Sequence, residues 1–158
     1  MGKLARVPCA PRYAASMHPV PSSIDPSQPH TPLFARLGAE PFRQLAAGLY
    51  TRIDGDPRIR AMFPEDLSAQ SDAVNDMSEF LIQFFGGPQT YSERKGHPRL
   101  RARHMRFPIT TDARDAWLSN ALGALDEVVS THQLDERAHD EIHRYLVATS
   151  QFMINTDA

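Results

Sequence analysis

Apolar residues recur at intervals of three and four along much of the chain, and this spacing constrains the fold more than any other feature. The first such series is Phe42, Leu45, Ala46, Leu49 and Ile53. Side chains with this spacing share one face of an α-helix. Because no stretch shows the alternation that a half-buried strand requires, the sequence predicts an all-α protein.

Three further helices are expected on the same grounds. Their apolar stripes lie within residues 73–84, 117–128 and 142–153. Thr111 or Asp112 can cap the second of these helices, because a side-chain oxygen at a helix start accepts a hydrogen bond from a free N–H of the first turn. Helices with such apolar faces can close a core or line a cavity, and both outcomes are open at this stage.

A basic and interrupted segment, residues 86–109, separates the second and third of the four helices. From Arg94 to Thr111 the chain has six Lys or Arg residues and no acid. The Gly and Pro residues of this segment exclude one long regular helix. Its two histidines, His97 and His104, could supply a metal ligand, and its arginines could bind an anion.

Composition indicates how the chain is organised. Residues 1–32 hold seven of the thirteen prolines and show no apolar period. This pattern is typical of a flexible extension, with a partner-docking arm as the alternative. Residues 33–158 carry the helical patterns and are expected to form one domain.

Several kinds of partner, site and location are disfavoured. A net charge of −2 over 158 residues gives no indication of nucleic-acid binding. Cys9 is the only cysteine, so neither a disulfide framework nor an all-cysteine metal site is expected. No run of about 18 apolar residues predicts a membrane span. The first residues lack the apolar core of a signal peptide, and a cytoplasmic location is expected.

His104 is the most informative histidine, with Arg103 and Arg106 close by. A single histidine is more often a surface or core residue than a metal ligand. Iron held by a porphyrin is the exception, because the macrocycle supplies four nitrogen ligands and the protein needs to supply only one imidazole. Nearby arginines could then pair with the two propionates of the porphyrin. A solvated basic face is the simpler reading of those arginines.

Tyr50 and Trp117 each combine an aromatic ring with one polar tip. Core packing is the simplest role for both, although a buried phenol or indole normally finds a hydrogen-bond partner. If both tips reach one cavity, they can donate hydrogen bonds to a small ligand. His139 and His143 are four residues apart, but the residues between them do not match HExxH, and an exposed helix face is the preferred interpretation.

Four sequence blocks occur in a distinctive order: LYTRIDGDPRIRAMFPEDL, FLIQFFGGPQTYSERKGHPRLRARHMRFPIT, RDAWL and FMIN. They lie within residues 33–156, and the pattern GGPxxYxxxxGHPxLRxRHxxF is long and specific. Together they resemble the truncated haemoglobins of the second group (O type) within the globin superfamily. The resemblance implies the truncated globin fold, a two-over-two helical sandwich around haem b (iron protoporphyrin IX).

The resemblance also implies a role for each residue of the site. His104 is the proximal ligand of the iron. Tyr50 and Trp117 are the polar aromatic residues that reach a bound ligand and would act in any catalysis. The haem pocket is expected to include Phe63, Ala73, Met77, Phe80, Leu81, Phe84, Tyr91, His97, Leu100, Arg103 and Phe107.

Two positions depart from the family pattern. Phe63 stands where many members have Tyr, which removes a hydroxyl donor. Asp76 stands where an Arg often meets a haem propionate. Pairing with the propionates would then fall to Arg103, Arg99, Tyr91 or His97.

The functions implied by the resemblance begin with reversible binding of O₂ and of NO, CO or peroxide. Redox turnover, as an NO dioxygenase or in peroxidase-like chemistry, would require a reductase as partner. A non-enzymatic sensor of O₂ or NO is the alternative, and an all-helical interaction protein without a cofactor is a third reading. A homodimer is left open.

Overall fold

The computed structural model describes residues 31–157, and every regular element within them is helical. The elements are α1 (Leu33–Leu37), α2 (Glu40–Asp54), η1 (Arg60–Met62), α3 (Asp72–Phe84), α4 (Thr90–Lys95), α5 (Leu100–His104), α6 (Thr111–His132) and α7 (Glu136–Met153). The predicted all-α class is confirmed. The expected extension, residues 1–32, lies outside the described residues except for Thr31 and Pro32. Within the described range, no helix is both long enough and apolar enough to cross a bilayer.

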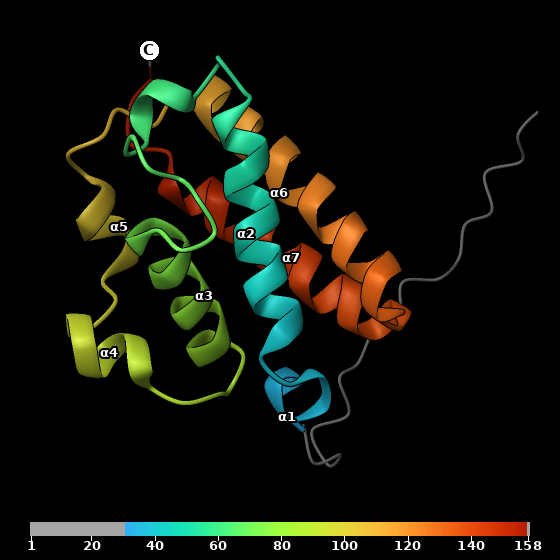
Figure 1. Ribbon diagram of the computed structural model, residues 1–158. Helices are drawn as coiled ribbons and strands as arrows, with labels where there is room; N and C mark the ends of the chain where they lie inside the picture. Colours follow the sequence, from blue (N-terminus) through green and yellow to red (C-terminus); the bar gives the residue numbers. More distant parts are fainter. Residues whose placement is uncertain (1–30, 158) are drawn as a thin grey trace, which may run out of the picture. The chain divides into compact units, whose positions relative to one another are not determined.

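Four long helices form the body of the fold. Helix α2 packs against both α3 and α6, and α6 packs against α7 (Figure 1). All five residues of the first apolar stripe are buried, and they meet Leu125 of α6 and Ile142 of α7 in one core. The two pairs, α2 with α3 and α6 with α7, form the two-over-two sandwich.

Side-chain caps fix the starts of α3, α6 and α7, whereas α2 begins without one. Ser71 accepts a hydrogen bond from the N–H of Val74 at 3.3 Å. Thr110 accepts one from the N–H of Ala113 at 3.1 Å. The expected cap at Thr111 or Asp112 was therefore wrong by one or two positions, because Thr110 is the last residue with extended backbone before the helix (φ −84°, ψ 172°).

Gly86 and Gly87 end α3 and turn the chain toward the basic segment. The N–H of Gly87 donates to the carbonyl of Ile82 at 2.8 Å, and the N–H of Gly86 donates to Gln83 at 3.2 Å. This pair of bonds is a Schellman motif, in which the residue after the cap adopts positive φ, as Gly86 does at 97°. Gly87 is also needed for space, because a Cβ there would lie 2.6 Å from Cγ2 of Ile82.

The apolar stripe of α3 faces two environments. Ala73, Met77 and Phe80 line a cavity, whereas Leu81 is fully buried in the core. A helix turns about 100° per residue, so Phe80 and Leu81 point to different neighbours. The last residue of the stripe, Phe84, is 54% exposed, and Phe85 takes the core position instead.

Candidate functional site

The basic segment folds into the two short helices α4 and α5, joined by a tight turn. Gly96 and Arg99 adopt positive φ, at 78° and 40°. The Arg103 guanidinium donates to the main-chain carbonyls of Pro98 (2.8 Å), Lys95 (2.6 Å) and His97 (3.3 Å). Part of the local arginine content therefore serves to fold the segment, and this folding positions His104 at the end of α5.

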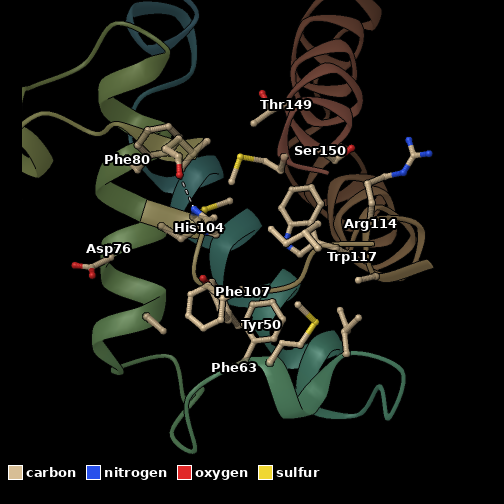
Figure 2. A pocket seen from close by; sticks show the side chains of 18 of the residues that line it. Tyr50, Phe63, Asp76, Phe80, His104, Phe107, Arg114, Trp117, Thr149 and Ser150 are labelled. Atoms are coloured by element: carbon tan, nitrogen blue, oxygen red, sulfur yellow. Dashed lines mark hydrogen bonds between the residues drawn. The ribbon is translucent and has the colours of Figure 1, made fainter. Parts of the chain in front are cut away.

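A cavity of about 370 Å³ lies between α2, α3, α6, α7 and this segment (Figure 2). The structure brings together ten of the residues that the sequence singled out. They are Tyr50, Phe63, Ala73, Met77, Phe80, Tyr91, Leu100, His104, Phe107 and Trp117. They come from five helices, the Phe63 corner and the segment after α5 that holds Phe107, so the convergence is a product of the tertiary fold.

Four residues expected in the pocket do not line this cavity. Leu81 belongs to the core, and the ring of Phe84 packs on that of Tyr145 with centroids 4.1 Å apart. His97 accepts a hydrogen bond at Nδ1 from the N–H of Arg99 at 3.2 Å. Arg103 is bound to the three carbonyls described above, and its guanidinium lies 6.0 Å from the ring centroid of Tyr91.

The sequence reasoning missed the contribution of α7 to the cavity. Tyr145, Thr149 and Met153 line it together with Ser150. They recur every four residues on α7, and a polar Thr on an inward stripe is a signal that the stripe faces a cavity as well as a core. Asp76, which the sequence placed at a propionate position, also lines the cavity. Cavity residues not expected from the sequence are Ile59, Met62, Pro64, Ile109, Ala113 and Arg114.

The His104 imidazole is oriented by its own helix. Its Nδ1 lies 2.7 Å from the carbonyl oxygen of Leu100, shown by the dashed line at His104 in Figure 2. A carbonyl can only accept, so Nδ1 carries the proton and Nε2 keeps a free lone pair. Metal-binding histidines commonly bind the metal with one ring nitrogen and donate the N–H of the other to a carbonyl or carboxylate, as His104 can do here.

Two donors of the cavity are free to serve a ligand. Neither the Trp117 indole N–H nor the Tyr50 hydroxyl has a hydrogen-bond partner among residues 31–157. Burial, with a smaller contribution from Asp76, raises the pKa of Tyr50 to about 12, so the phenol stays protonated at neutral pH. The ring of Phe63 meets Tyr50 edge to face at 5.9 Å and adds no donor.

Charged residues lie on the α3–α4 side of the cavity. The carboxylate of Asp76 pairs with Arg94 at 2.5 Å and with Lys95 at 3.0 Å, and Arg94 also pairs with Glu79 at 2.7 Å. Burial raises the pKa of Asp76, but the hydrogen bonds from the two cations outweigh burial and the net pKa is lowered. The cations nearest Asp76 are therefore already neutralised within the protein.

The lining of the cavity suits a largely apolar cofactor that carries one iron. Its wall is mostly aromatic and aliphatic, and His104 offers a single free nitrogen. Among the described residues, no group of three or more His, Cys, Asp or Glu side chains could hold a metal ion by itself. A porphyrin meets this arrangement, because it brings the other four nitrogen ligands of the iron.

Comparisons with known proteins agree with this geometry. The family model for bacterial-like globins matches residues 32–151. The group 2 truncated hemoglobin YjbI of Bacillus subtilis is 36% identical over 122 residues, which cover 77% of this chain and 87% of that protein.

Solved structures show the same relationship. The crystal structure of a hemoglobin from Chloroflexus aurantiacus is 40% identical and covers 80% of this chain and 99% of its own, with a TM-score of 0.72. The group II truncated hemoglobin of Bacillus anthracis is 33% identical and covers 83% of this chain and 95% of its own, also with a TM-score of 0.72. The chain therefore belongs to the group 2 truncated haemoglobins, a family of the globin superfamily whose members bind small diatomic ligands at haem.

Proposed function

We propose that the protein holds haem b through Nε2 of His104 and reversibly binds O₂ and other diatomic ligands there. The observation that carries the proposal is the convergence of His104, Tyr50 and Trp117 on one cavity. Bound haem would supply the iron at which these ligands bind. The protein's own residues supply the axial imidazole, the hydrogen-bond donors and an apolar enclosure.

The two donors have separate roles in ligand retention. Trp117 can only donate, through its indole N–H, whereas the Tyr50 hydroxyl can donate or accept. Both favour a ligand that carries partial negative charge, because hydrogen bonds to charged acceptors are stronger than neutral ones. Slow release of O₂ is the expected result, and it fits redox chemistry better than oxygen delivery.

The propionates would lie near Arg103 and Tyr91. The Arg103 guanidinium donates only to carbonyl groups and has no acidic partner within residues 31–157. Its positive charge is therefore still available to a carboxylate, unlike that of Arg94, which is shared between two acids. Arg99 and His97 are further candidates from the same segment.

The reaction we favour is oxidation of NO to nitrate with O₂ and one electron, supplied by a reductase. Reduction of peroxide to water, with two electrons and two protons, is the second candidate. His104 is the only histidine among the described residues that line the cavity. With no second imidazole as a general base, proton transfer during peroxide reduction would depend on water or Tyr50, so NO oxidation is preferred.

An absorption experiment tests the cofactor, and turnover assays test the reaction. The full-length protein should show a Soret band that is lost in His104→Ala and kept in the matched control His139→Ala. A protein that stays colourless and folded after haem addition would refute the proposal. With a reductant present, NO consumption with nitrate formation indicates an enzyme, whereas ligand binding without turnover indicates a sensor.

A further inference from the structure

The helix that carries His104 cannot hold its position alone. Helix α5 has five residues, and helices this short are unstable in isolation. No side chain caps its start, where Arg99 has left-handed backbone at φ 40° and ψ 49°. The direction of the His104 imidazole must therefore depend on contacts outside α5.

The segment after α7 supplies several of these contacts through one side chain, that of Asn155. Its Nδ2 donates to the carbonyl of Phe107 at 3.0 Å and, over a longer 3.4 Å, to the carbonyl of His104 itself. Its Oδ1 accepts from the N–H of Ile109 at 3.0 Å. One amide thus joins both ends of residues 104–109, the corner that follows the histidine.

Main-chain bonds reinforce this contact. The N–H groups of Asn155 and Thr156 donate to the carbonyl of Ile109 at 3.0 and 3.3 Å. From α5 itself, Nη1 of Arg101 donates to the carbonyls of Phe152 and, at 3.1 Å, of Ile154. A cation at the last carbonyls of α7 is also favoured by the helix dipole.

We propose that Asn155 is a positioning residue that sets the geometry of the bond between His104 and iron. The inference rests on the proposed role of His104 as the iron ligand. Leu100 fixes the imidazole from within α5, and Asn155, in the segment after α7, fixes the backbone that carries it. Without the amide, the 104–109 corner can shift, and the imidazole tilts and moves relative to the cofactor.

Two variants of Asn155 and one control test this role. Asn155→Ala removes all side-chain bonds, and the nearly isosteric Asn155→Asp keeps an acceptor for Ile109 but cannot donate to the carbonyls. Asp135→Ala is the matched control. Asp135 lies outside the site and caps the other end of α7, where its carboxylate accepts a hydrogen bond from the N–H of Ala138 at 2.8 Å.

The main readout is the iron–histidine stretching band of the ferrous protein by resonance Raman spectroscopy, with the rate of haem transfer to apomyoglobin beside it. Both Asn155 variants should shift or broaden the band. Asn155→Asp loses the two hydrogen bonds that Nδ2 donates to the carbonyls of His104 and Phe107, and this loss should speed haem transfer about ten-fold. The control should lower folding stability and leave the band unchanged.

The outcomes separate this inference from the proposed function. If the wild-type protein binds haem through His104 but Asn155→Asp keeps the wild-type band and the wild-type rate of haem loss, the positioning role is refuted. The same holds if the Asp135→Ala control shifts the band as much as the Asn155 variants do. If the wild-type protein has no iron–histidine band at all, the proposed function itself fails.

Discussion

Replacing Trp117 by Phe removes one hydrogen-bond donor and keeps an aromatic ring in the cavity. The indole N–H has no partner within residues 31–157, so no protein bond is broken by the change. A hydrogen bond to a charged acceptor contributes about 1.5–3 kcal/mol. At about 1.4 kcal/mol per factor of ten, Trp117→Phe should speed O₂ release by about 10–100-fold.

Stopped-flow displacement of O₂ by CO measures this release rate directly. Phe63→Tyr is the matched opposite change, because it returns a hydroxyl to a ring that already packs edge to face against Tyr50. It should slow O₂ release. The wild-type Soret spectrum in both variants would show that the proximal side is intact.

The reasoning is refuted if Trp117→Phe leaves the O₂ release rate unchanged while the haem stays bound to His104. An unchanged rate would mean that the N–H does not reach the ligand. Tyr50→Phe would then show whether the phenol alone retains it.

Two further predictions concern pH and packing. Burial raises the pKa of Tyr50 to about 12, above its unfolded value near 10, so its contribution to stability is complete below pH 10 and is lost toward pH 12. The free energy of unfolding should fall over that range, and less steeply in Tyr50→Phe. Gly87→Ala should destabilise by about 1–3 kcal/mol in urea unfolding, because its Cβ would meet Ile82 at 2.6 Å. Gly55→Ala is the matched control, since its nearest contact is an ordinary 3.7 Å, and an equal loss in both would contradict the packing argument.

The long helices could be predicted from the sequence because each buries a periodic stripe. The series from Phe42 to Ile53 is wholly buried in α2, and periodicity alone was enough to place it. Thr110 was missed as a cap because Thr and Asp residues follow one another there, and only the backbone angles decide which one precedes the helix.

The site was predicted less completely, for physical reasons. One stripe of α3 serves a cavity and a core at once, so pattern does not separate Phe80 from Leu81. Charge in a sequence does not reveal its partner, and Arg103 binds backbone carbonyls. Asn155 contacts Phe107 across 48 positions of the chain, a distance over which no local pattern carries information.

That separation has a consequence for how the protein is made. A ribosome adds roughly 5–20 residues per second, so Asn155 is synthesised about 2–10 s after Phe107, its partner 48 positions earlier. During that interval the histidine side of the cavity lacks a completed α7, and it lacks the Asn155 amide throughout. The corner at residues 104–109 therefore gains its side-chain contacts only after Asn155 has been added, and firm capture of a cofactor would follow that step.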